Sequence, residues 1–97
     1  MAEIVFSEEA FADLERILEF LLQTSSEHAS EAFHDIRIAV DVLGKHPLVG
    51  GRIESQIREL VISWGNAGYL ALYRFDPALN VVRILRIRHQ REAGYMD

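Results

Sequence analysis

The sequence predicts a single α+β domain in which a short N-terminal strand and an antiparallel two-helix hairpin precede a three-stranded antiparallel meander. Apolar residues recur at spacings of three and four between positions 11 and 43, which is the period of amphipathic helices. From position 57 onward, β-branched and aromatic residues dominate runs that are separated by turn residues. The chain shows no linker, repeat or low-complexity tract, so residues 1–97 are expected to form one domain around one core.

Residues 3–6, Glu-Ile-Val-Phe, are predicted to form the first strand, and Ser7 is expected to end it by capping a helix. Two glutamates follow in the first helical turn, where negative charge is favourable. The face expected to pack on the sheet is apolar at helical spacing and consists of Phe11, Leu14, Ile17, Leu18, Leu21 and Leu22. The side expected to face solvent carries Asp13, Glu15, Arg16 and Glu19.

The run 23–26, Gln-Thr-Ser-Ser, interrupts this period, and Ser25 or Ser26 is expected to cap a second helix that begins near Glu27. The apolar stripe of that helix consists of Ala29, Ala32, Phe33, Ile36, Ala39, Val40 and Leu43. Gly44 is predicted to end it in a left-handed conformation, since Pro47 prevents continuation. Because the connection is short, the two helices are expected to lie antiparallel.

Residues 48–56 are predicted to be irregular and to lie along the sheet edge, and residues 57–64 begin the meander. Its last two strands are joined by a turn in which Asp76 bonds its own backbone, Pro77 presets φ and Asn80 tolerates a left-handed conformation. Strict alternation along the final strand would place Val82, Ile84, Arg86 and Arg88 on one face and Val81, Arg83, Leu85, Ile87 and His89 on the other. Neither face of that strand would then be wholly apolar.

The charges divide unevenly along the chain, whose net charge is −5. Residues 1–43 contain ten acidic and two basic residues, whereas residues 44–97 contain eight basic and five acidic residues. The acidic total argues against non-specific binding to nucleic acid. The division indicates either two faces that meet different partners or acidic helices that complement basic strands, and both interpretations stay open.

Cysteine is absent, which excludes a disulfide framework and a thiolate metal site. The histidines at 28, 34 and 46 lack the spacing of metal ligands, so no metal and no cofactor is expected. No secretory signal is visible at Met1–Ile4, and no run approaches the length of a membrane span. A cytoplasmic protein without a membrane partner is the expectation.

The basic end of the hairpin is the candidate functional surface. The predicted target-binding residues are Arg58, Arg83, Arg86, Arg88 and Arg91. The alternative is that Arg83 and Arg86 protect the sheet from aggregation, and that Arg58 pairs with a helix carboxylate. Trp64, Tyr69 and Tyr73 are interpreted as core residues rather than stacking platforms for bases.

The order of these elements resembles that of the ParE/RelE superfamily of toxins from bacterial type II toxin–antitoxin modules. The motifs that carry the resemblance are Pro47 through Gly50-Gly51, Arg58-Glu59-Leu60, Gly68-Tyr69, Tyr73-Arg74 and Ile84-Leu85-Arg86-Ile87-Arg88-His89. The ending resembles the ParE branch, often labelled plasmid-stabilisation proteins. The resemblance implies a toxin neutralised by a cognate antitoxin, with DNA gyrase as the target, and leaves a homodimer and a heterotetramer with the antitoxin open.

The RelE branch implies cleavage of messenger RNA on the ribosome by a basic cluster with a tail tyrosine. The match to that branch is partial, since Leu70 stands where it carries Arg and Leu60 where it carries a second Lys. If the chain is a ribonuclease, the candidate catalytic residues are His89, Tyr95, Arg88 and Arg91, or Glu59 and His89 as base and acid. The leading hypothesis is therefore a protein-binding toxin without chemistry of its own, and a third is a toxin fold that retains only complex formation and autoregulation.

Overall fold

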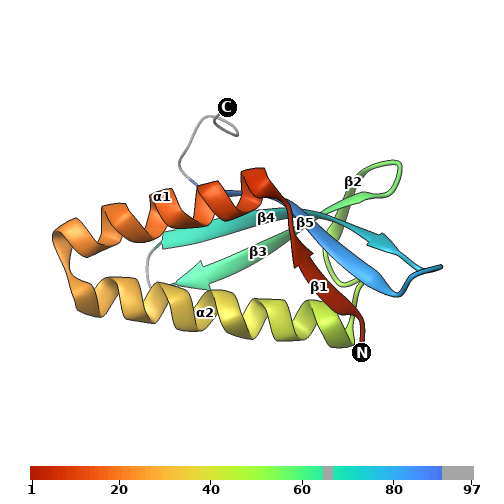
Figure 1. Ribbon diagram of the computed structural model, residues 1–97, viewed down its shortest axis with the longest axis horizontal. Helices are drawn as coiled ribbons and strands as arrows, with labels where there is room; N and C mark the ends of the chain where they lie inside the picture. Colours follow the sequence, from red (N-terminus) through yellow and green to blue (C-terminus); the bar gives the residue numbers. More distant parts are fainter. Residues whose placement is uncertain (65–66, 91–97) are drawn as a thin grey trace.

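The computed structural model describes residues 1–64 and 67–90, with residues 63, 64 and 67 described by their backbone only. Two helices lie on one face of a five-stranded sheet (Figure 1), which confirms the predicted α+β fold. In chain order the elements are β1 (Glu3–Phe6), α1 (Glu8–Thr24), α2 (Ser26–Lys45), β2 (Gly51–Glu54), β3 (Ile57–Trp64), β4 (Ala67–Asp76) and β5 (Val81–His89). The strands are arranged in the order β1-β5-β4-β3-β2.

The sheet contains two more strands than the predicted meander. β1 pairs in parallel with β5, which adds the first strand to one edge. Residues 48–56 lie along a sheet edge as predicted, but the prediction that they are irregular is wrong for Gly51–Glu54, because β2 pairs antiparallel with the start of β3, Gly51 lying opposite Glu59. Ser55 makes the tight connection possible by adopting a φ of 43°, a conformation that sequence pattern does not signal for serine.

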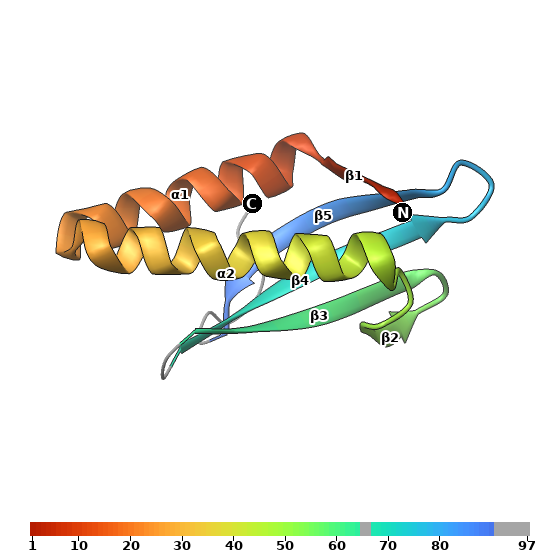
Figure 2. The same cartoon turned by 90° about the horizontal axis from the view of Figure 1, so that it is seen from below.

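Serine side chains define both helix starts. The Ser7 hydroxyl accepts a hydrogen bond from the Ala10 N–H, as expected of the first cap. Ser25 serves both helices, since its N–H donates to the Leu21 carbonyl at the end of α1 and its hydroxyl accepts from the His28 N–H at the start of α2. The helices form the predicted antiparallel hairpin (Figure 2).

The predicted role of Gly44 is wrong. α2 continues to Lys45 and is capped by His46, so Gly44 lies inside the last helical turn. Its small size has a different use: a Cβ at this position would lie 3.2 Å from the Met1 Cε atom and 3.4 Å from the Ala2 carbonyl oxygen. The Ala2 N–H donates to the Gly44 carbonyl, so the glycine lets the start of the chain approach the helix.

The apolar face of α1 is rotated from its predicted position. Its buried residues are Ala10, Asp13, Ile17 and Leu21, whereas Phe11 and Leu22, predicted to pack on the sheet, are 56% and 57% exposed. Phe33 of α2 is also exposed, at 45%. The sheet contacts only a narrow stripe of each helix, so part of the broad apolar surface faces outward. Asp13, predicted to face solvent, is buried at 5% exposure.

A β-bulge corrects the predicted alternation in β5. Leu72 lies opposite Arg86 and Tyr73 lies opposite Ile84, so Leu85 is an extra residue in the ladder. The insertion reverses the facing of every later residue in β5. As a result, the face covered by the helices receives Val82, Ile84 and Ile87, all buried, and the opposite face receives Arg83, Arg86 and Arg88.

The β4–β5 turn and the core aromatic residues match their predictions. The Asp76 carboxylate accepts from the N–H groups of Ala78 and Leu79, and Asn80 has a φ of 53°. Tyr69 and Tyr73 are buried, whereas the side chain of Trp64 lies outside the described residues. Across residues 1–64 and 67–90, no helix is long and apolar enough to span a membrane.

Candidate functional site

The sheet face opposite the helices, here called the arginine face, is the candidate site. Four arginines from β4 and β5 occupy it, because the bulge gathers those of β5 on one side. Pairing across β3, β4 and β5 assigns to this face Ile57, Glu59, Val61, Leu72, Arg74, Arg83, Arg86 and Arg88. Sequence alternation alone missed this grouping, and Arg74 was not among the predicted site residues.

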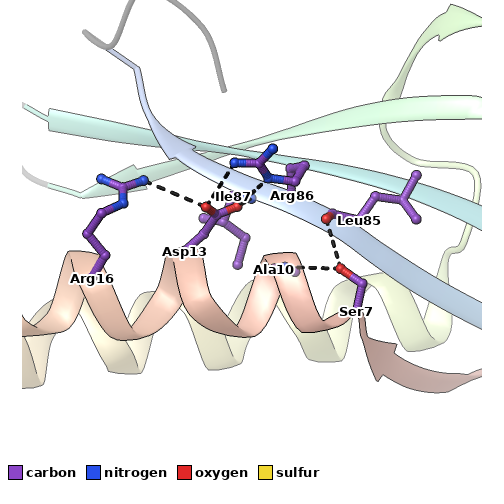
Figure 3. Close-up of polar contacts among 7 residues, drawn as sticks. All are labelled: Ser7, Ala10, Asp13, Arg16, Leu85, Arg86 and Ile87. Carbon is purple, nitrogen blue, oxygen red and sulfur yellow. Dashed lines mark hydrogen bonds and ion pairs between the residues drawn. The ribbon is translucent and has the colours of Figure 1, made fainter. Parts of the chain in front are cut away.

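Arg86 is held by α1 (Figure 3). Its Nε donates to one Asp13 carboxylate oxygen at 2.8 Å and its Nη2 donates to the other at 3.1 Å. The same Asp13 accepts the Ile87 N–H at 2.9 Å, and Arg16 lies 3.8 Å away in a longer ion pair. Bidentate, charge-assisted bonds of this kind fix the guanidinium firmly. The Arg86 side chain therefore reaches around the edge of β5 and binds Asp13 of α1.

Ser7 and Asp13 together complete the edge of β5. β1 stops at Phe6, opposite Ile84, and the Ser7 N–H donates to the Ile84 carbonyl. The Ser7 hydroxyl then donates to the Leu85 carbonyl at 2.9 Å, while Asp13 takes the Ile87 N–H (Figure 3). The Leu85 carbonyl and the Ile87 N–H, which lie beyond the end of β1, are thus bonded by side chains at the start of α1, as buried polar groups require.

Arg58 also serves the fold. Its cross-strand partner is Tyr73, which places it on the face toward the helices, and its Nη1 donates to the carbonyls of Leu48 and Gly50. The Tyr73 hydroxyl accepts the Gly50 N–H at 2.9 Å. Burial raises the pKa of Tyr73 above 10.0, an effect that the Gly50 bond and the charge of Arg58 partly oppose. This cluster anchors the segment that leads into β2.

The remaining arginines differ in their surroundings. Arg74 and Arg83 lie directly opposite each other on β4 and β5, and neither has a hydrogen-bond or ion-pair partner among residues 1–64 and 67–90. Arg88, opposite Leu70, makes a long 3.4 Å hydrogen bond to the His89 carbonyl. Arg91 and Tyr95 lie outside the described residues.

The two residues considered as a base–acid pair lie on different faces of the sheet. Glu59 pairs with Leu72 on the arginine face. His89 pairs with Tyr69 on the face toward the helices, and its ring meets the Tyr69 ring edge-on at a centroid distance of 5.3 Å. Within the described part of the chain, no cluster of three or more His, Asp or Glu side chains could hold a metal ion.

A groove of about 250 Å³ runs between the outward sides of α1 and α2. It is lined by Leu18, Leu22, Ser26, Ala29, Ser30 and Phe33. The four apolar residues of this set were predicted to pack in the core. The excess of apolar surface on α1, wider than one sheet contact can bury, was the signal that could have revealed the groove.

Comparison with known proteins decides the family. The protein-family model described as ParE toxin of type II toxin-antitoxin system, parDE, matches residues 4–94. The chain belongs to the ParE toxin family. It is 33% identical over 92 residues to a protein called Toxin RelE3 from Caulobacter vibrioides, covering 95% of this chain and 98% of that relative. The predicted superfamily and its ParE branch are confirmed, and the chain is a ParE-type toxin of a type II toxin–antitoxin system.

Two solved structures share the ParE fold seen here. The chromosomal ParDE system from P. aeruginosa has a TM-score of 0.70 at 24% identity, covering 92% of this chain and 96% of that chain. The intact RelBE toxin–antitoxin complex from E. coli has a TM-score of 0.66 at 12% identity, covering 95% of this chain and 100% of that one. The five-stranded sheet with two helices on one face is therefore common to both named branches.

Proposed function

We propose that this toxin acts in the cytoplasm by gripping a protein target, with DNA gyrase as that target, and that an antitoxin holds it inactive until the antitoxin is lost. Family membership supports the pairing with an antitoxin. The observation that supports a non-enzymatic toxin is the separation of Glu59 and His89 across the sheet, which disfavours these two residues as a base–acid pair.

General acid–base cleavage requires both groups to reach one phosphate within hydrogen-bond distance. Glu59 pairs with Leu72 and His89 with Tyr69, which sets them three residues apart along β4, or roughly 10 Å, in addition to the opposite facing. The edge-on contact with Tyr69 further turns the His89 ring toward the core side. These positions favour a structural role for His89 over proton transfer.

The proposed target contact centres on Arg88, near the C-terminal end of β5, and on Arg91. Arg58 and Arg86, predicted in the same set, are bound by Gly50 and Asp13, and Arg88 itself donates to the carbonyls of His89 and Gln90 at 3.4 and 3.5 Å. Planar guanidinium groups suit carboxylates on a protein target, because each can donate two parallel hydrogen bonds. Arg83 lies five residues earlier on β5, roughly 15 Å away, and is therefore not part of this contact.

The antitoxin is expected to lay an amphipathic helix into the groove between α1 and α2. Leu18, Leu22 and Phe33 line this groove and offer the apolar contacts that a helical ligand places at spacings of three and four residues. Leu22 and Phe33 are large and about half exposed, which is typical of surfaces that become buried on association.

A ribosome-dependent messenger RNA endonuclease is the second candidate. The relative called Toxin RelE3, 33% identical to this chain, favours it. In that case Arg88 and Arg91 would bind the phosphate, and His89 with Tyr95 would move protons.

Induced expression of variants tests the proposal. His89→Gln should leave growth arrest intact, because a gripping toxin needs no proton carrier, while Arg88→Gln with Arg91→Gln should abolish arrest without unfolding the protein. Arg37→Gln, which removes one positive charge from the exposed side of α2, is the control for loss of surface charge. Gyrase supercoiling and messenger RNA fragmentation are measured alongside growth.

Fragments that disappear with His89→Gln, with a rate loss of about 10²–10⁴, would replace the proposal with the endonuclease. If inhibition of supercoiling persists in His89→Gln but is lost in the double arginine variant, the result supports the proposed binding of DNA gyrase. A wild-type chain that binds antitoxin and arrests nothing would instead identify a toxin fold that serves only complex formation.

A further inference from the structure

Arg74 and Arg83 form a pair at the turn end of the arginine face. Along one line across four adjacent strands, Val5 of β1 lies beside Arg83, Arg83 beside Arg74, and Arg74 beside Ile57 of β3. Arg74 is exposed and Arg83 half-buried. The β4–β5 turn lies at the end of the molecule opposite the α1–α2 connection (Figures 1 and 2).

Neither of these two charges has an ion-pair partner among residues 1–64 and 67–90. Like charges directly opposite on neighbouring strands repel each other and destabilise a sheet. The closest acidic residue along β4 is Asp76, whose Oδ1 atom is committed to the Ala78 and Leu79 N–H groups in the turn. No carboxylate of the described residues forms an ion pair with either arginine. The cost is recovered when an anionic group binds between the two guanidinium groups.

We propose that Arg74 and Arg83 together bind one carboxylate of an acidic, partly apolar segment of the antitoxin. This inference rests on the proposed function, which supplies the antitoxin. Cβ atoms of directly opposite residues lie roughly 5 Å apart, so each guanidinium can donate to one oxygen of the same carboxylate. Val5 and Ile57 at the two ends of the line, with Leu72 in the next row, provide apolar contact on either side.

A single carboxylate fits this site better than the phosphates of a nucleic acid. The chain has a net charge of −5, and Glu3, Asp76 and Glu59 belong to the rows on either side of the pair. A polyanion passing over the pair would meet these charges, whereas a mixed segment places one acid on the arginines and neutral residues beside them. Nucleic acid binding becomes a separate outcome of the test.

The test uses full-length toxin and the purified product of the reading frame adjacent to its gene, titrated by calorimetry. Arg74→Gln with Arg83→Gln should weaken this complex about 10- to 100-fold and make its affinity less sensitive to salt. Arg37→Gln, the control on α2, should change the affinity less than threefold. The double variant should still arrest growth, because Arg88 and Arg91 remain. Co-expressed antitoxin should rescue cells that express the double variant less well than cells that express the wild-type toxin, because the complex is weaker.

Unchanged affinity in the double variant would overturn this inference and leave the proposed function standing. If wild-type toxin neither binds that product nor arrests growth, the proposed function itself fails. Nucleic-acid binding by the pair is tested separately, by fluorescence anisotropy with a 12-nucleotide single-stranded RNA. RNA binding that the double variant loses, with antitoxin affinity unchanged, would assign the pair to phosphate instead of carboxylate.

Discussion

The arginines at the two ends of β5 differ in how they are bonded to the rest of the protein. In the C-terminal half of β5, two hydrogen bonds to Asp13 hold Arg86 in place. In the same half, Ser7 bonds the Leu85 carbonyl and Asp13 bonds the Ile87 N–H. At the turn end, Arg83 faces Arg74 without a carboxylate partner among the described residues. One strand thus carries one arginine that is bonded to α1 and another that has no bonded partner in residues 1–64 and 67–90.

This difference shows that a row of arginines in a sequence is not one surface. Bonds at 2.8 and 3.1 Å to a carboxylate that is 5% exposed identify Arg86 as part of the fold. Arg83, half-buried and directly opposite a like charge, is the arginine that we propose for binding.

Asp13→Ala should cost about 3–5 kcal/mol of unfolding free energy. The change leaves the Arg86 guanidinium, whose side chain is 19% exposed, without its carboxylate, and it leaves the buried Ile87 N–H without an acceptor. Urea denaturation followed by circular dichroism measures the loss.

Two variants control for that result. Asp13→Asn keeps an oxygen for the Ile87 N–H and should lose less, whereas Arg16→Ala removes only the 3.8 Å ion pair and should cost under about 1 kcal/mol. A loss below about 1 kcal/mol for Asp13→Ala would mean that the pair does not hold β5, and the contrast between its two ends would disappear.

Tyr73→Phe should cost about 1–3 kcal/mol at neutral pH, because the buried Gly50 N–H loses its acceptor. The wild type should also lose stability as pH rises above about 10. Burial raises the pKa of Tyr73 in the folded protein, so the unfolded chain releases this proton first and is favoured as pH increases.

A comparison of the wild type with Tyr73→Phe separates the titration of Tyr73 from that of Lys45 and the other tyrosines. Denaturation midpoints measured between about pH 8 and pH 11 should fall more steeply in the wild type than in Tyr73→Phe. Parallel pH profiles would show that the Tyr73 hydroxyl does not titrate differently in the folded and unfolded chains.

Much of the fold was accessible from sequence because local chemistry specified it. Ser7, Ser25 and Asp76 act where side-chain capping and turn rules place them, and the helix period predicted the hairpin. β2 was missed because four exposed residues that include a glycine carry no strand signal. Gly44 was misassigned because its close approach to Ala2 depends on tertiary contact.

The candidate site was less predictable, since a single inserted residue decides it. Leu85 is an ordinary strand residue in sequence, yet its bulge moves Arg86 and Arg88 from the predicted face of Val82 and Ile84 to the face of Arg83. Asp13 gave a similar problem: a carboxylate on α1 reads as solvent-facing until a guanidinium from β5, 73 positions away, is placed against it. Pairings over such distances leave no local pattern.

The smallest predicted effect has the opposite sign. Arg83→Gln in the free toxin should raise the unfolding free energy by about 0.2–1 kcal/mol, because it removes repulsion across the Arg74–Arg83 pair while keeping a polar side chain of moderate length. Arg86→Gln should do the reverse and destabilise the protein, since it strips Asp13 of its bidentate partner. Urea denaturation of both variants at low and high salt measures the difference, and the gain from Arg83→Gln should shrink as salt screens the charges. If Arg83→Gln destabilises the free toxin as much as Arg86→Gln does, then Arg83 serves the fold, and β5 does not divide its arginines between structure and binding.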